Sequence, residues 1–77
     1  MITIYGKQGC PQCDQAKRFC EQVGQEYQYL TLGVDYQREE FIQQMQNECG
    51  VTPRTMPQIV QDGVYIGGFA ELKAHLS

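Results

Sequence analysis

The feature that most constrains the fold is a pair of cysteines, placed where a strand-like segment gives way to a helical one. Cys10 and Cys13 form a C-x-x-C pair. The segment Met1–Tyr5 before them is mostly apolar, β-branched or aromatic, which indicates a buried strand. Pro11 suits the first helical position, because its missing N–H has no helical partner there. From there on, apolar residues recur at helical spacing and form one stripe: Cys13, Ala16, Phe19, Cys20 and Val23. The pair is therefore predicted at the start of a helix that follows a strand.

The rest of the chain keeps alternating between strand-like and helical patterns. Asp62-Gly63 is a strong signal for a two-residue hairpin turn between two short strands. The prolines between 52 and 57 require an extended or turned segment, because each biases its predecessor away from helix. Strands are further expected over 26–32, 58–61 and 64–67, and helices from 11 to a stop at Gly24, over 37–49 and over 69–76.

This order, β-α-β-α-β-β-α, indicates an α/β fold with a four-stranded mixed sheet flanked by three helices. The first βαβ unit predicts two parallel strands, and the hairpin adds antiparallel ones. A C-x-x-C pair at the start of the helix in such a unit is typical of thioredoxin-like redox proteins. With 77 residues, we expect a single domain over 1–77.

The charge balance narrows the classes of partner. Six Lys and Arg stand against nine Asp and Glu, a net charge of −3. This balance argues against binding to a nucleic-acid backbone or to an anionic membrane surface, which both require a basic face. Residues 1–5 lack the basic start of a signal peptide, and no apolar run approaches the roughly 20 residues of a membrane span. We therefore expect a cytoplasmic protein.

The chemistry of the pair follows from its place at the predicted helix start. There the unpaired N–H groups and the positive end of the helix dipole favour a thiolate at Cys10, and the thiolate is the form that attacks a disulfide. Cys13 lies one turn further on and is placed to attack the mixed disulfide formed at Cys10. The prediction is a nucleophile at Cys10 and a resolving thiol at Cys13.

Two other interpretations of the pair are an inert dithiol and half of a zinc site. Structural zinc usually takes two pairs of ligands, whereas Cys20, Cys49 and His75 are unpaired. Cys20 also shares the apolar stripe of the first helix, as a small core residue would. The spacing therefore favours redox chemistry and no metal.

Three separated segments, in this order, make the sequence resemble the glutaredoxins over nearly its whole length. They are Ile4-Tyr5-Gly6 with Gly9-Cys10-Pro11-x-Cys13 and Ala16-Lys17; Thr55-Met56-Pro57-Gln58-Ile59; and Asp62-Gly63 with Ile66-Gly67-Gly68. The compact length is most similar to the small dithiol glutaredoxins of bacteria and large tailed phages. The resemblance implies a thioredoxin-like fold and glutathione as the reductant, with protein disulfides and glutathione mixed disulfides as substrates.

The resemblance also implies a glutathione site. Thr55-Met56-Pro57 resembles the loop whose proline is cis and whose backbone pairs with the cysteinyl part of glutathione. Gly67-Gly68 and Phe69 resemble the site for the γ-glutamyl end, and two glycines before a helix suit an anion. The remaining implied contacts are Lys7 to the glycine carboxylate, Glu71 to the amine, and Gln12 beside the tripeptide.

The sequence departs from the family pattern at Gln12, where the family most often has Tyr. Glutamine can form hydrogen bonds but cannot stack on the bound tripeptide. Ala70 likewise has no polar side chain where the family usually has one. Gln37 and Arg38 open the second helix near a family contact to glutathione, but the loop aligns loosely and neither is included in the predicted site.

The resemblance implies one protein partner, and three alternative activities stay open. Some small members of the family supply electrons to ribonucleotide reductase, which is therefore a candidate partner of this protein. We expect the protein itself to be a monomer. A phage source would place the protein in the host cytoplasm. The alternatives are a [2Fe–2S] cluster-binding glutaredoxin, which usually lacks the second cysteine, a thioredoxin-type reductant served by a flavoenzyme, and a zinc-binding module.

Overall fold

The strands and helices follow one another in the predicted order. The computed structural model describes all residues, 1–77. The elements are β1 (Ile2–Gly6), α1 (Pro11–Gln22), β2 (Tyr27–Thr31), α2 (Arg38–Cys49), β3 (Gln58–Gln61), β4 (Val64–Gly67) and α3 (Phe69–Leu76). The predicted boundaries are confirmed to within one or two residues, and Gln37 is the N-cap of α2 rather than its first residue. None of the helices combines the length and the hydropathy that a membrane-spanning segment requires.

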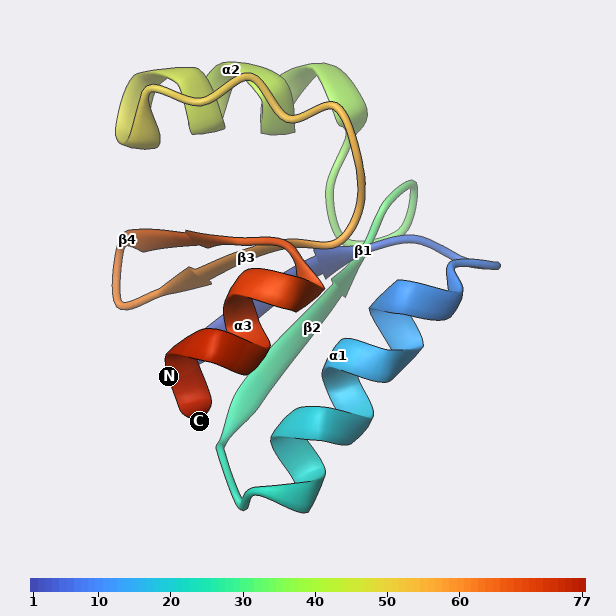
Figure 1. Cartoon of the computed structure of the whole chain (residues 1–77). Helices are drawn as coiled ribbons and strands as arrows, with labels where there is room; N and C mark the ends of the chain where they lie inside the picture. The colour runs from blue at the N-terminus through green and yellow to red at the C-terminus, as the bar shows by residue number, and fades with distance from the viewer.

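The four strands form one mixed sheet in the order β2-β1-β3-β4 (Figure 1). β1 runs parallel to β2 and antiparallel to β3, and β3 pairs with β4 in the predicted hairpin. Asp62 and Gly63 at its turn both have positive φ, 50° and 83°, as two-residue hairpins with the strand twist require. β1 is an inner strand, so the loop that follows it starts from the middle of the sheet, at the end where β1 terminates.

The sheet carries helices on both faces. α1 and α3 lie side by side on one face, and α2 covers the other (Figure 1). The main core lies between the sheet and the α1–α3 layer and consists of Ile2, Ile4, Ala16, Cys20, Ile59 and Leu72. The predicted apolar stripe of α1 is confirmed at Ala16 and Cys20 but is wrong at Val23. That residue caps the helix and is 49% exposed, because the stripe has by then run past the end of the sheet.

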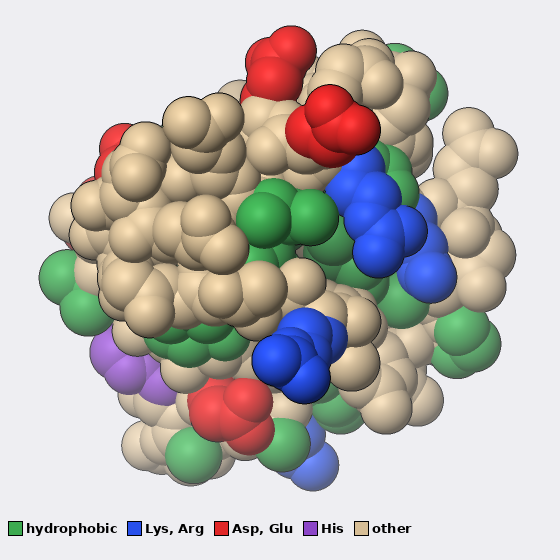
Figure 2. All heavy atoms as spheres, turned by 90° about the horizontal axis from the view of Figure 1, so that it is seen from above, with side chains coloured by type: hydrophobic (Ala, Val, Ile, Leu, Met, Phe, Trp, Pro, Cys, Tyr) green, Lys and Arg blue, Asp and Glu red, His purple; other side chains and the backbone are tan.

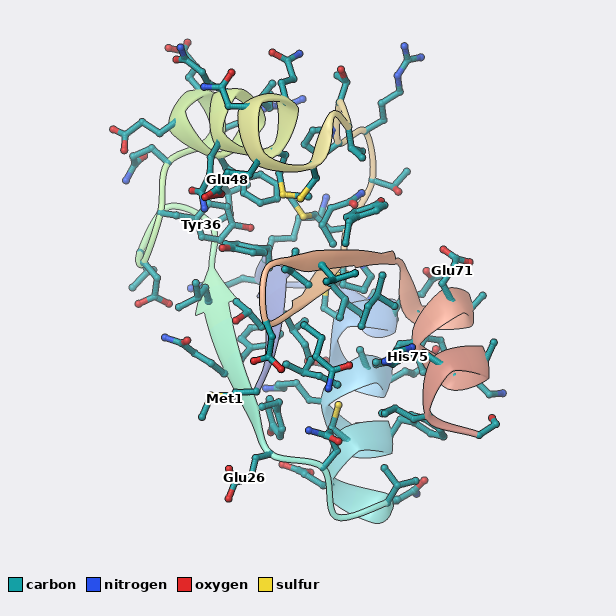
Figure 3. All side chains as sticks on the ribbon, turned by 90° about the vertical axis from the view of Figure 1, so that its left-hand side faces the viewer. Met1, Glu26, Tyr36, Glu48, Glu71 and His75 are labelled. Atoms are coloured by element: carbon teal, nitrogen blue, oxygen red, sulfur yellow. A yellow bond between two sulfur atoms is a disulfide. The ribbon has the colours of Figure 1, made fainter.

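An aromatic cluster joins α2 to the other face of the sheet. Phe41 of α2 lies against Tyr5 of β1, with ring centroids 4.6 Å apart, and Tyr36 contacts both rings. The Tyr36 hydroxyl donates a hydrogen bond of 2.8 Å to the Gly6 carbonyl. Figure 3 shows Tyr36 between α2 and the sheet. This cluster holds α2 above the end of β1, next to the cysteine-bearing loop.

A first prediction concerns Gly6. A Cβ built there would lie 2.6 Å from Cζ of Tyr29, whose ring crosses the end of β1. We expect Gly6→Ala to lower the free energy of unfolding by about 1–3 kcal/mol, since the ring must move. Urea unfolding would measure this loss, and in a Tyr29→Ala background the loss should nearly vanish. An equal loss in both backgrounds would contradict the proposed clash.

A second prediction concerns Tyr36 at alkaline pH. Burial raises the pKa of Tyr36 from its ordinary value near 10 to about 12. Between these values the unfolded chain loses this proton while the folded protein keeps it, so the free energy of unfolding falls as the pH rises from 10 to 12. Below pH 10 this contribution is fully present. Urea unfolding at pH 9, 10 and 11 should show the fall, and it should be shallower in Tyr36→Phe; the same slope in both proteins would refute the assignment.

Candidate active site

The two cysteines lie at the start of α1, joined by a disulfide. Cys10 is the N-cap, with extended backbone (φ −112°, ψ 103°), and Pro11 occupies the first turn. The Cys10 sulfur accepts a hydrogen bond from the Cys13 N–H at 3.2 Å. The sulfur thus takes the capping role that a Ser or Asp oxygen has in other helices.

This position suits a nucleophilic sulfur. In the reduced protein the Cys13 N–H and the positive end of the α1 dipole both stabilise negative charge on Cys10. The two cysteines differ in access, because Cys13 is fully buried whereas Cys10 is 5% exposed and lines two surface hollows. An incoming disulfide can therefore reach Cys10 and not Cys13.

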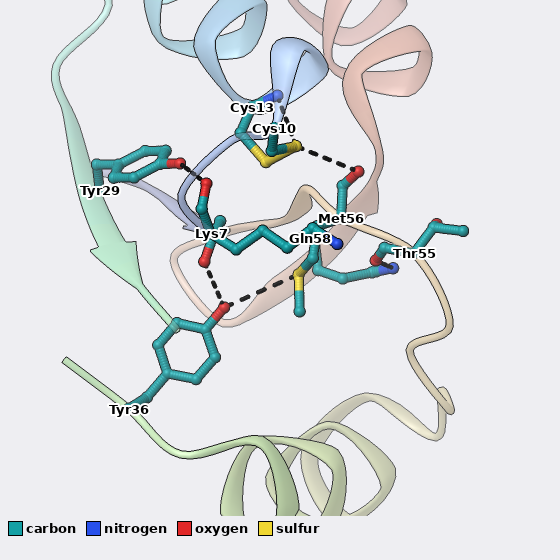
Figure 4. The surroundings of a disulfide bond; sticks show 9 residues. Lys7, Cys10, Cys13, Tyr29, Tyr36, Thr55, Met56 and Gln58 are labelled. Atoms are coloured by element: carbon teal, nitrogen blue, oxygen red, sulfur yellow. Dashed lines mark hydrogen bonds between the residues drawn. A yellow bond between two sulfur atoms is a disulfide. The ribbon is translucent and has the colours of Figure 1, made fainter. Parts of the chain in front are cut away.

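The Thr55–Pro57 loop lies against the cysteine pair. The Met56–Pro57 peptide bond is cis, as the resemblance implied. The Met56 carbonyl oxygen lies 3.9 Å from Cys10 Sγ, and the Met56 sulfur lies 3.8 Å from the Tyr36 hydroxyl (Figure 4). A reduced thiol at Cys10 can donate to that carbonyl. The loop thus presents backbone groups to whatever is bound at the sulfur.

A chain of hydrogen bonds from the sheet supports this loop. The buried Gln58 amide donates to the Thr55 carbonyl at 2.7 Å, and its oxygen accepts from the Tyr65 hydroxyl at 2.6 Å. Gln58 is the first residue of β3, so both bonds tie the loop to β3 and β4. The sequence pattern around Pro57 included Gln58 without a role; its burial and its partners now supply one.

A groove begins at Cys10 and continues toward α2. Its part next to the sulfur is lined by Lys7, Gly9, Cys10, Pro11, Gln12, Arg54, Thr55 and Met56. Its deeper part under α2 shares Lys7, Arg54, Thr55 and Met56 and adds Arg38 and an apolar floor that includes Phe41 and Ile42. The predicted residues Lys7, Gln12, Thr55 and Met56 are therefore brought together around Cys10.

Two arginines that the sequence analysis left out of the predicted site also line the groove. Arg38 opens α2 and Arg54 precedes the Thr55–Pro57 loop, and both line the deeper part together with Lys7. Figure 2 shows cationic side chains around a hollow that holds apolar ones. No carboxylate lines either part of the groove. The signal for Arg54 was its place directly before the proline loop.

The glycine segment lies on the other side of the loop. A Cβ on Gly68 would lie 3.7 Å from the Pro57 carbonyl, and Gly67 has a φ of 125°, where a side chain would meet Glu71. The Gly68 N–H was expected to be free for an anion. Instead it donates a hydrogen bond of 2.8 Å to the Glu71 carboxylate, and the Phe69 ring lies toward Phe19 of α1 rather than in the groove.

The remaining cysteines lie apart from the pair. Cys20 is buried in the core, where burial raises the pKa of its thiol. Cys49 is half-buried at the end of α2. No group of three or more His, Cys, Asp or Glu side chains comes together in the structure.

Comparison with known proteins identifies the family. The glutaredoxin family model matches residues 2–66. Glutaredoxin 3 of Escherichia coli is 38% identical over 74 residues, covering 95% of this chain and 82% of the relative, and glutaredoxin 1 of the same organism is 34% identical over 77 residues, covering 94% and 87%. Glutaredoxin 1 of Francisella tularensis, solved with cacodylate, superposes with a TM-score of 0.81 at 34% identity, covering 96% and 88%. The chain therefore belongs to the glutaredoxins, thiol–disulfide oxidoreductases with the thioredoxin-like fold.

Proposed function

We propose that this glutaredoxin uses glutathione to reduce protein disulfides and glutathione mixed disulfides, with Cys10 as nucleophile and Cys13 as resolving thiol. The observation that carries the proposal is the asymmetry of the pair. One sulfur caps a helix at the surface beside a cationic groove, and the other is buried behind it. Such an arrangement suits attack by one cysteine and resolution by the other.

The reaction on a glutathione mixed disulfide needs only Cys10. Its thiolate attacks the glutathione sulfur, a Cys10–glutathione disulfide forms, and the protein thiolate leaves and takes up a proton. A second glutathione thiolate then attacks the glutathione sulfur held on Cys10. This step releases oxidised glutathione and restores the Cys10 thiolate.

The reaction on a protein disulfide needs both cysteines. Cys10 attacks one substrate sulfur and releases the other as a thiolate. Cys13 then attacks Cys10 Sγ, which frees the second substrate thiol and closes the Cys10–Cys13 disulfide. Two glutathione molecules reduce that disulfide and leave as one molecule of oxidised glutathione. The Cα atoms of the two cysteines, 5.2 Å apart, are within disulfide reach.

The groove beside Cys10 fits glutathione in charge. We assign its glycine carboxylate to Lys7, Arg38 and Arg54, and its cysteinyl part to the Thr55–Pro57 backbone. The γ-glutamyl carboxylate is assigned to Gly67 and Gly68 at the start of α3, with Glu71 facing the amine and Phe69 next to it. Because Glu71 already holds the Gly68 N–H, the carboxylate must displace it or use the neighbouring N–H groups.

Ribonucleotide reductase is a proposed protein partner on the basis of the family alone. The groove does not distinguish it from other disulfide-containing proteins. Purified reductase supplied with glutathione, glutathione reductase and this protein would test the assignment directly.

A third prediction separates the two cysteines. Cys10→Ser should abolish reduction of both a glutathione mixed disulfide and a protein disulfide. Cys13→Ser should stop only the protein disulfide, because removal of glutathione needs Cys10 alone. Turnover coupled to glutathione reductase measures the first reaction, and insulin reduction measures the second. Full activity of Cys10→Ser would refute the assigned roles.

A fourth prediction tests the cationic rim. Arg38→Gln and Arg54→Gln should each raise the KM for a glutathione mixed disulfide by about two- to fivefold, since each removes one exposed charge pair. Lys17→Gln is the matched control, because its ammonium lies 4.5 Å over the Tyr29 ring and outside the groove. Equal effects in all three variants would mean that overall charge, not the groove, sets the KM.

A further inference from the structure

Cys10 also borders a hollow on the side away from the glutathione groove. This second hollow is lined by Gly9, Cys10 and Pro11 and by three side chains along α1, Asp14, Gln15 and Arg18. Asp14, Gln15 and Arg18 do not line the groove toward α2, whereas residues 9–11 border both surfaces. A substrate disulfide at Cys10 therefore has a separate surface available on each side of the sulfur.

The hollow continues along the surface between α1 and α3. A further hollow is lined by Gln15, Arg18, Phe19, Gln22, Phe69 and Lys73. Because Gln15 and Arg18 belong to both, the two form one track, which we call the α1–α3 track. Figure 1 shows the two helices side by side on this face of the sheet.

The far end of the α1–α3 track has an apolar floor and a cationic rim. Phe19 and Phe69 meet edge to face, with ring centroids 6.3 Å apart, and both rings are half-buried. Arg18 and Lys73 stand at the rim, and the Lys73 ammonium lies 5.7 Å from the Phe69 centroid. The one ion pair in the structure joins the Met1 amine to Asp62, so these two cations have no carboxylate partner in a chain of net charge −3.

The length of the track indicates what occupies it. From Cys10 to Gln22 α1 rises about 18 Å, which an extended chain of five or six residues spans. Glutathione, with its ends assigned to the opposite groove and to α3, is too short to fill it as well. A polypeptide attached to the substrate sulfur is long enough.

We propose that the α1–α3 track binds the polypeptide flanking the reactive cysteine of a disulfide substrate, and that it favours segments with an apolar side chain next to carboxylates. The apolar side chain lies on Phe19 and Phe69, and the carboxylates pair with Arg18 and Lys73. This inference rests on the proposed function and adds a protein-recognition surface to it. Binding here lowers the KM for protein substrates without changing the chemistry at Cys10.

The test uses three glutathione mixed disulfides. One carries a peptide whose cysteine is flanked on both sides by Leu and two Glu, the second has Lys in place of Glu, and the third carries only a hydroxyethyl group. Wild type should use the acidic peptide with about five- to tenfold higher kcat/KM than the basic one, and the difference should lie in KM. At 0.5 M salt the preference should shrink, because the cations are exposed.

Reversing the charge of Arg18 and Lys73 tests whether these two side chains cause the preference for the acidic peptide. The double variant Arg18→Glu/Lys73→Glu should lose the preference and lower kcat/KM for the acidic peptide about tenfold. Its turnover of the hydroxyethyl substrate should stay within twofold of wild type. Lys17→Glu is the control, since it changes charge on the same helix at a side chain that lies over Tyr29 and lines neither hollow.

The outcomes separate the two proposals. If wild type turns over the hydroxyethyl substrate but shows no acidic preference, or if the double variant keeps that preference, the track is not the recognition surface. Equal losses in Lys17→Glu, or on the hydroxyethyl substrate, would also overturn the inference. No turnover of any mixed disulfide by wild type would refute the glutathione-dependent function itself, and this inference with it.

Discussion

The contact on which the site depends is the hydrogen bond from the Cys13 N–H to the sulfur of Cys10. In an ordinary helix a side-chain oxygen accepts such an N–H, and its loss costs about 1 kcal/mol of stability. Here the acceptor is the reactive sulfur. The bond that begins α1 is therefore also the bond that stabilises a thiolate, and the helix cannot be capped by another residue without losing the nucleophile's environment.

The elements around this contact hold the backbone next to Cys10 in place. β1 is the central strand beside β2 and β3, so the loop that follows it has little freedom. Tyr36 and Phe41 brace one side of that loop by packing on Tyr5, and the Tyr36 hydroxyl donates a hydrogen bond to the Gly6 carbonyl. From the other side, Gln58 and Tyr65 hold the loop that carries Met56. Cys10 thus lies between two loops that the sheet and its packing hold in place.

Local patterns in the sequence were enough to predict the order of strands and helices and the position of the cysteine pair at a helix start. Pro11 and Asp62-Gly63 act through backbone preferences that a short segment expresses by itself, so the start of α1 and the hairpin turn were predictable. The exposure of Val23 was not, because it depends on where α1 outruns the sheet. Arg38 and Arg54 are 16 residues apart in the chain, and only the packing of α2 over the proline loop brings them beside Lys7. Glu71 differs from these arginines, because its bond to the Gly68 N–H is a local contact between the N-cap of α3 and the third residue of that helix. The spacing of Gly68 and Glu71 in the sequence was enough to predict it.

The surfaces on the two sides of Cys10 differ in the ligand that they suit. Toward α2, three cations and no carboxylate surround a short groove with an apolar floor, which suits a small ligand with a terminal carboxylate. Along α1 the surface is longer and shallower. Its two cations, Arg18 and Lys73, both line the far part of the track, whereas Asp14 lines the part next to Cys10. A mixed disulfide has the same division, since a tripeptide lies on one sulfur and a protein on the other. A single reactive sulfur between a short groove and a long track can hold both halves at once, and cleavage of the bond between them then separates the tripeptide from the polypeptide.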